Sequence, residues 1–123
     1  MNDCLFCDIM MESKVLENKF FYAVFDRYPV NLGHLLIISK KHIPDLFCLD
    51  EAEFKHLYGI INQAKEMLDM KYKPAGYNIG VNCGDSAGQT ILHFHLHIIP
   101  RYKNDVENPR GGIRNIKKPL EYY

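Results

Sequence analysis

Apolar runs of strand length alternate along the chain with polar segments that end them. Residues 34–39 form an almost continuous apolar run, which predicts a buried central strand. Residues 15–26 are rich in β-branched and aromatic side chains around a polar step at 17–19, which predicts two short strands joined by a tight turn. Further strands are expected over 77–82 and 91–99, and the second of these is expected to end at Pro100.

Two helices are expected from apolar residues spaced three and four apart. The longer helix is predicted over 51–70 with Asp50 as its N-cap, and a shorter one is predicted over 4–12. Several short strands interrupted by one long helix favour an α+β domain built on an antiparallel sheet. The apolar stripe expected to bury the long helix consists of Phe54, Leu57, Tyr58, Ile61, Ala64 and Leu68.

The composition indicates one compact domain and limits the classes of molecule that the chain is expected to bind. With 123 residues, 47% of them hydrophobic and 24% charged, residues 1–123 are expected to form a single domain with one core. The 15 basic residues balance the 15 acidic ones, so neither nucleic acid nor an anionic membrane is an expected partner. An anionic substrate would have to be held by a local site.

The sequences near the two ends of the chain lead to two further predictions. The N-terminus lacks the pattern of a secretory signal and no apolar run reaches membrane length, so we expect a cytoplasmic protein with reduced thiols. The sequence becomes polar after Pro100, and residues 102–123 are therefore expected to form an extended C-terminal arm.

His93, His95 and His97 alternate with apolar residues, so on a strand their imidazoles would share one face. One alternative is that all three are hydrogen-bonded structural histidines, and another is that they bind one metal ion. Four residues of extended chain separate His93 from His97 by about 13 Å, too far for one ion with bonds of about 2 Å. His93 and His97 are therefore expected to have different roles. The central His95 is well placed to be a nucleophile assisted by a neighbouring histidine.

The chain resembles the histidine-triad family. That family's signature is His, apolar, His, apolar, His, apolar, apolar, and residues 93–99 match it at every position. Residues 33–43 are similar to the family's strand-and-turn segment, and residues 82–90 to its phosphate loop. The resemblance covers residues 4–101. It implies a HIT-like fold with about five antiparallel strands, one long and one short helix, and a homodimer.

The resemblance also implies a two-step reaction. His95 is expected to attack the α-phosphate of a nucleotide conjugate and form a nucleotidyl-histidine, which water then hydrolyses to a nucleoside monophosphate. His97 would contact the α-phosphate and aid the leaving group, while His34 would lie beside His95 and orient it. The residues expected to hold phosphate oxygens are Asn82, Gln89 and Thr90.

Nucleoside recognition is expected in the first part of the chain, again by resemblance. Asp26 matches the acidic residue that binds the ribose hydroxyls, where a carboxylate accepts charge-assisted hydrogen bonds. Arg27 would lie at the edge of the base pocket. The apolar residues that match this pocket, and that could instead simply be core, are Leu5, Phe6, Ile9 and Val24.

Cys4 and Cys7 have the spacing of half a tetrahedral zinc site, although one such pair is a weak signal. Free thiols and a redox pair are alternatives, but a redox pair usually follows a strand of a βαβ unit. The resemblance extends to family members and galactose-1-phosphate uridylyltransferases with a structural zinc. It implies that His42 and His93 complete the ligands in a closed shell, and that no catalytic metal is needed.

The basic residues Arg101, Arg110 and Arg114 resemble those of family members associated with diadenosine polyphosphates, where arginine would bind the additional phosphates. A solvated tail is the alternative. The leading hypothesis is a hydrolase that cleaves adenosine conjugates at the α-phosphate, with diadenosine polyphosphates favoured. The alternatives are an AMP phosphoramidase, a non-catalytic nucleotide-binding adaptor and a metal-dependent hydrolase that uses the triad as ligands.

Overall fold

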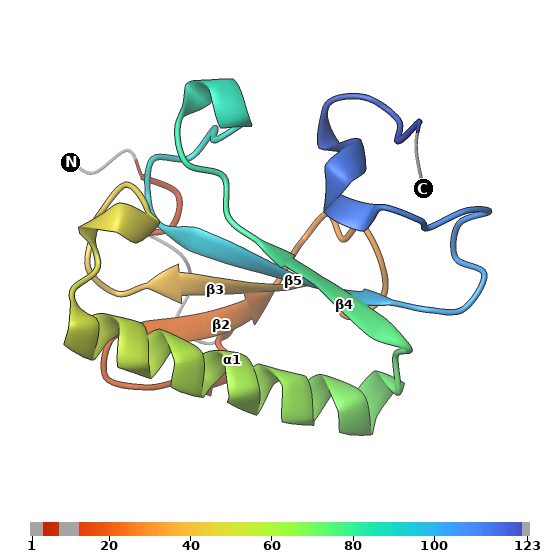
Figure 1. The fold of residues 1–123 in the computed structure, drawn as a ribbon. Coiled ribbons are helices and arrows are strands. Elements are labelled where there is room, and N and C mark those ends of the chain that lie inside the picture. The colour runs from red at the N-terminus through yellow and green to blue at the C-terminus, as the bar shows by residue number, and fades with distance from the viewer. Residues whose placement is uncertain (1–3, 8–12, 122–123) are drawn as a thin grey trace.

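The computed structural model describes residues 4–7 and 13–121, and in this part of the chain five strands form one sheet (Figure 1). The strands follow the order β1-β2-β3-β5-β4, and every neighbouring pair is antiparallel. This confirms the prediction of an α+β fold with a five-stranded antiparallel sheet. The strands are β1 (Leu16–Glu17), β2 (Phe21–Phe25), β3 (Leu35–Ser39), β4 (Gly76–Gly80) and β5 (His95–Arg101).

The long helix α1 (Glu51–Tyr72) lies across one face of the sheet (Figure 1). Its start is set by a capping box, because Asp50 accepts a hydrogen bond from the Glu53 backbone at 2.8 Å and Glu53 accepts one from the Asp50 backbone at 3.0 Å. It ends where Lys73 takes the left-handed conformation, with φ 52°. The predicted start is confirmed, and the helix runs two residues further than predicted. No helix within the described residues is long and apolar enough to cross a membrane.

The predicted buried stripe of α1 is partly wrong. Phe54 and Tyr58 are 45% and 69% exposed, whereas Ile60, left out of the prediction, is fully buried. Successive helical residues are about 100° apart, so Tyr58 points well away from the buried Leu57. The stripe that faces the sheet therefore consists of Leu57, Ile60, Ala64 and Leu68, with Glu53 buried at its start.

The two faces of the sheet have different partners because side chains alternate along each strand. The face toward α1 forms the main core and includes Phe21, Ala23, Leu35, Ile37, Leu96 and Ile98. The other face carries a second apolar cluster, which consists of Phe6, Tyr22, Val24, Leu36 and Ile38. On this second face, His95 lies opposite Ile38 and His97 opposite Leu36. The catalytic candidates are thus on the face away from the helix.

Several element boundaries differ from the predictions. The strand expected over 91–99 begins only at His95 and continues through Pro100 to Arg101. Proline can remain in β5 because its fixed φ suits extended backbone, and its carbonyl still accepts a hydrogen bond from Asn31 at 3.1 Å. Of the short helix predicted over 4–12, residues 8–12 lie outside the described part, and residues 4–7 form a turn.

The segment expected to be an extended arm turns back beside the sheet within the described residues up to 121. It forms a short 3-10 helix, η4 (Gly112–Ile116), which lies on the side of the sheet away from α1 (Figure 1). A Cβ built on Gly80 of β4 would lie 3.9 Å from Ile113 Cδ1, so η4 packs close to that strand.

The root of this segment is held by one carboxylate. Asp105 accepts two hydrogen bonds from the Arg101 guanidinium, at 2.8 and 3.0 Å, and one from the Asn31 side chain at 2.7 Å. The backbone N–H of Tyr102 donates to the same carboxylate at 2.9 Å. These donors favour the charged form, so the Arg101 guanidinium above all holds the pKa of Asp105 below its ordinary value.

Replacing Asp105 with asparagine is expected to lower the thermal midpoint by a few degrees at pH 6. A lowered folded-state pKa contributes stability above the ordinary value of 3.8, and this contribution is lost as pH falls below it. The difference between wild type and D105N should therefore shrink between pH 5 and pH 2.5. Thermal unfolding by circular dichroism across this range measures it, with the exposed Asp85→Asn as control. A difference that does not depend on pH would contradict the assignment.

Candidate functional site

His95 and His97 project from β5 on the face away from α1, with ring centroids 5.3 Å apart. His34, directly before β3, lies against His97, and its Nε2 is 2.9 Å from His97 Nδ1. The expectation that His34 lies beside His95 is wrong. Because Leu36 pairs with His97 and Ile38 with His95, position 34 falls beyond His97 in the antiparallel register.

The tautomer of His95 follows from its hydrogen bond to the backbone. His95 Nδ1 lies 2.8 Å from the carbonyl oxygen of His93. A carbonyl can only accept, so Nδ1 carries the proton and donates it. In the neutral ring, Nε2 then keeps a free lone pair. His95 is half-buried on the face of the sheet away from α1, which we call the open face.

His97 is held in the opposite tautomer by a chain of two hydrogen bonds. The backbone N–H of Val30 donates to His34 Nδ1 at 3.0 Å, so the proton of neutral His34 must be on Nε2. This Nε2–H donates a hydrogen bond to His97 Nδ1. Since His97 Nδ1 is the acceptor, the proton of neutral His97 is on Nε2. His95 and His97 therefore place a lone pair and an N–H donor next to each other.

Burial favours the neutral forms of His97 and His34. It is the main cause that lowers the pKa of His97 to about 4, and nearby His95 and His34 lower it further. Burial also lowers the pKa of His34, although Asp26 opposes this shift. Asp26 Oδ2 lies 3.5 Å from His34 Nε2. At neutral pH His97 is therefore a hydrogen-bond donor without a positive charge.

Asp26, His34 and His97 also bring three metal-ligating atoms within 4.8 Å of one another. The tautomer of His34 argues against a metal ion there. Its only lone pair in the neutral ring, on Nδ1, already accepts the Val30 N–H, and its Nε2 carries a proton. This arrangement gives no support to the alternative of a metal-dependent hydrolase.

The residues expected to bind the nucleoside differ in how deeply they are buried. Phe6 and Val24 are buried together on the face that carries His95 and His97. Asp26 is partly buried, and its Oδ1 accepts a hydrogen bond from the Tyr28 backbone at 2.8 Å. Leu5 and Arg27 are exposed, and Ile9 lies outside the described residues.

Gln89, one of the expected phosphate ligands, has a different position. Its amide nitrogen donates to the carbonyl oxygens of Pro44 at 2.6 Å and Ile91 at 3.1 Å, and its amide oxygen accepts from the Gly84 backbone at 2.9 Å. Both amide hydrogens are thus already donated to backbone carbonyls, so the expectation that this side chain donates to phosphate is not supported. Asn82 is partly exposed and Thr90 is exposed.

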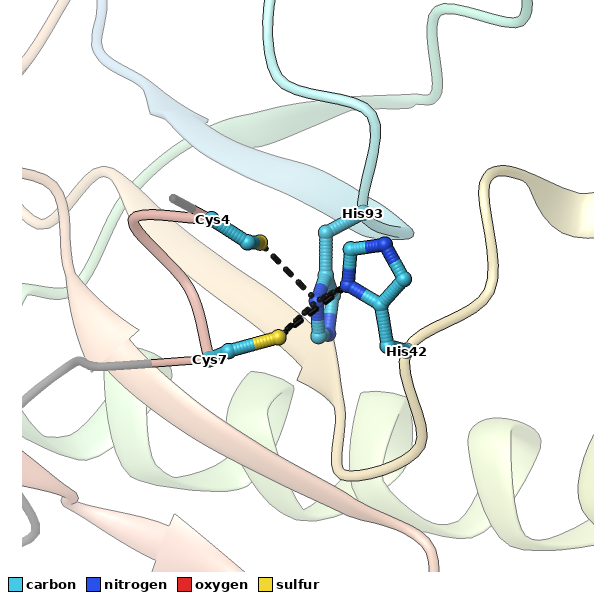
Figure 2. Close-up of side chains that lie close together, drawn as sticks. All are labelled: Cys4, Cys7, His42 and His93. Atoms are coloured by element: carbon cyan, nitrogen blue, oxygen red, sulfur yellow. Dashed lines mark hydrogen bonds between the residues drawn. The ribbon is translucent and has the colours of Figure 1, made fainter. Parts of the chain in front are cut away.

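The side chains of Cys4, Cys7, His42 and His93 converge from three segments of the chain (Figure 2). Cys7 Sγ lies 3.0 Å from His42 Nδ1 and 3.4 Å from His93 Nδ1, and Cys4 Sγ lies 3.3 Å from His93 Nδ1. The two imidazole Nδ1 atoms are 3.1 Å apart. We call these four residues the Cys₂His₂ cluster.

The chemistry of the Cys₂His₂ cluster fits zinc. With bonds of about 2.0 Å to nitrogen and 2.3 Å to sulfur, neighbouring ligands of a tetrahedral zinc lie about 3.3 to 3.8 Å apart. The spacings of 3.0 to 3.4 Å approach this range. His93 Nε2 also donates to the Ser39 carbonyl at 2.7 Å, which leaves a lone pair on the Nδ1 that faces the cluster.

His93 reaches the cluster because it is not part of β5. It lies in a bend two residues before the strand and is 1% exposed, so the predicted shared strand face holds only for His95 and His97. The roles of Val30 and Ser39 were not predicted. Both act through backbone atoms, which leave no signal in the type of side chain.

Comparisons with known proteins agree with this geometry. The family described as HIT domain matches residues 10–104. An uncharacterized HIT-like protein of Mycoplasma genitalium is 41% identical over 121 residues, which cover 95% of this chain and 83% of that protein. A protein of Mycobacterium tuberculosis named AP-4-A phosphorylase is 34% identical over 92 residues. These cover 74% of this chain but only 47% of the phosphorylase, so the match spans about half of that protein.

Two solved structures are also similar. A HIT family protein from Bacillus anthracis has a TM-score of 0.76 and 36% sequence identity, and the match covers 84% of this chain and 76% of that one. A zinc-bound histidine triad family protein from Mycobacterium smegmatis has a TM-score of 0.75 and 29% identity, with 84% and 78% covered. The family match spans most of the chain and the folds agree. This chain therefore belongs to the HIT family.

Proposed function

We propose that this protein is a nucleotide hydrolase that cleaves adenosine conjugates at the α-phosphate through a nucleotidyl-histidine on His95. The observation that carries the proposal is the pair of opposite tautomers on β5. His95 offers a lone pair on Nε2, and His97 beside it offers an N–H on Nε2. A nucleophile next to a donor is the arrangement that covalent phosphoryl transfer requires.

In the first step, His95 Nε2 attacks the α-phosphorus. The new N–P bond forms as the P–O bond to the leaving group breaks, and the electron pair leaves with that oxygen. The His97 N–H donates a hydrogen bond to the developing negative charge. In the second step, water attacks the same phosphorus, its proton passes to solvent, and His95 leaves as the neutral imidazole.

The neutral state of His97 bears on the substrate class. With a pKa of about 4, His97 is neutral at neutral pH, so it donates a hydrogen bond but carries no imidazolium proton to transfer to a leaving group. A nucleoside polyphosphate can leave as a stable anion without a proton, whereas the amine of a phosphoramidate must gain one. This favours diadenosine polyphosphates over AMP phosphoramidates. The relative named AP-4-A phosphorylase supports the same substrate class.

The proposal predicts that AMP becomes attached to His95 during turnover. Protein mixed with diadenosine tetraphosphate and quenched rapidly should show an AMP adduct on the peptide that contains His95, measured by mass spectrometry. The kcat/KM for diadenosine tetraphosphate should exceed that for an AMP phosphoramidate. A reversed preference would identify a phosphoramidase. Binding without turnover or adduct would identify an adaptor and refute the proposal.

We also propose that the Cys₂His₂ cluster holds a structural zinc ion. The four donors form a closed shell, so the ion would contribute stability and has no open position for substrate. The fit of the donor spacing and the zinc-bound relative from Mycobacterium smegmatis support this assignment. Cys4, Cys7, His42 and His93 would be the ligands.

The expected homodimer remains a proposal. Phe54 and Tyr58 on α1 are aromatic and exposed in the single chain, and such side chains are favoured in interfaces between subunits.

A further inference from the structure

The loop between the two cysteines of the cluster carries a buried aromatic side chain. Phe6 is 6% exposed and packs into the apolar cluster on the open face of the sheet. The Tyr22 hydroxyl donates to the Phe6 carbonyl at 2.9 Å, which holds the loop against β2. Cys4 is two residues before Phe6 and Cys7 directly follows it, so whatever holds the cysteines also restrains the Phe6 ring.

We propose that Phe6 is a positioning residue that couples the Cys₂His₂ cluster to the imidazole of His95. The inference rests on the proposed function, in which His95 is the nucleophile. The Phe6 ring meets the His95 ring in a T-shaped contact, with centroids 4.8 Å apart and planes at 64°. The same ring meets His93 at 6.1 Å and 84°. One side chain thus contacts both the cluster and the nucleophile.

A second connection runs through His93 itself. The Nδ1 atom of His93 faces the two cysteine sulfurs. Its backbone carbonyl oxygen accepts a hydrogen bond from His95 Nδ1–H, with 2.8 Å between oxygen and nitrogen. The His93 ring is held from behind by the Ser39 carbonyl. The His95 ring is therefore restrained by the hydrogen bond that it donates to His93 and by the ring of Phe6, a residue that lies between Cys4 and Cys7 in the sequence.

The two restraints control different motions. The hydrogen bond to His93 fixes which nitrogen carries the proton, but the ring can still tilt about this bond. The Phe6 ring limits that tilt, because aromatic pairs prefer an edge-to-face arrangement. Leucine at position 6 would fill much of the same volume without this directional contact. Phe6→Leu is therefore expected to keep the buried apolar volume at position 6 but to lose the restraint on the orientation of the His95 ring.

The test compares zinc-loaded wild type with Phe6→Leu. With diadenosine tetraphosphate, kcat is expected to fall about 10-fold while KM stays within about 2-fold, because orientation and not binding is lost. In protein labelled with ¹⁵N-histidine, His95 should show the Nδ1–H tautomer in both proteins, whereas its ring signals should be sharp in wild type and broadened in the variant, where the ring can tilt. The His95 signal is identified by its absence in His95→Ala. Zinc affinity, measured by titration with Zn²⁺ alone, should be unchanged.

Phe21→Leu is the matched control, since Phe21 is fully buried on the helix side of the sheet. It should lower thermal stability without changing kcat or the His95 signal. A rise in KM at constant kcat for Phe6→Leu would make Phe6 a base contact only and overturn the inference. Equal effects of both variants on kcat would also overturn it, because the role would then be structural.

The coupling to the metal has its own readout. Removing zinc from wild type should broaden the ring signals of His95 in the same way as Phe6→Leu, and adding Zn²⁺ should restore the sharp signals. An unchanged His95 signal after zinc removal would overturn the coupling. These signals need no substrate. If wild type fails to turn over any nucleotide, the proposed function fails while the coupling is still tested.

Discussion

His95→Ala is expected to lower kcat by about 10⁴-fold or more, because it removes the nitrogen that forms the bond to phosphorus. Nucleotide binding should remain measurable, since Asp26, Val24 and the rest of the open face are unchanged. Steady-state kinetics with diadenosine tetraphosphate measure the first effect, and calorimetric titration with AMP measures the second. The AMP adduct should also disappear from the peptide that contains residue 95.

The control for this prediction is His56→Ala on α1. The His56 ring makes an edge-to-face contact with Phe20, with centroids 4.8 Å apart, and its Nδ1 donates a hydrogen bond to the Ala52 carbonyl; it has no place in the proposed chemistry. The variant His56→Ala should retain a kcat close to that of wild type. Full activity in His95→Ala would refute the covalent mechanism.

Removing zinc is expected to lower the thermal midpoint by about 16 °C. A ligand present at 1,000 times its Kd stabilises the folded state by about 4 kcal/mol, and for a chain of this size each kcal/mol shifts the midpoint by about 4 °C. Elemental analysis of the purified protein should find one zinc per chain. Thermal unfolding of wild type with and without a chelator measures the change in midpoint. The double variant Cys4→Ser/Cys7→Ser should show the same lower midpoint.

Cys48→Ser provides the matched control, because Cys48 is an exposed cysteine outside the cluster. This variant should keep one zinc per chain and the midpoint of wild type. A wild-type protein that loads no zinc, or whose midpoint ignores the chelator, would contradict the structural assignment.

Local patterns in the sequence determined the elements of the fold. The apolar run before Lys40 became the central strand β3, and Asp50 with Glu53 set the start of α1 through contacts three residues apart. Alternation along β5 placed His95 and His97 on one face. These features depend on neighbours within a few positions, so the order of residue types is enough to predict them.

Four long-range results could not be predicted from these patterns alone. His34 lies against His97 because of strand register, and His93 turns toward Cys4 and Cys7 because β5 begins only at His95. Gln89 closes its loop through the carbonyl of Pro44, which is 45 residues away. Of the proposed zinc ligands, Cys4 and Cys7 were indicated by their spacing, whereas His42 and His93 were expected only through family resemblance.

The sequence by itself therefore determined the fold class, the strand that carries the proposed nucleophile and the residue types in the candidate site. Tertiary structure decided which nitrogen of each histidine carries its proton. That choice depends on the amide of Val30 and the carbonyl of His93, and on the meeting of residues 34 and 97 across the sheet. Backbone groups are the same at nearly every position. Only the folded arrangement gives these two their effect on the imidazoles.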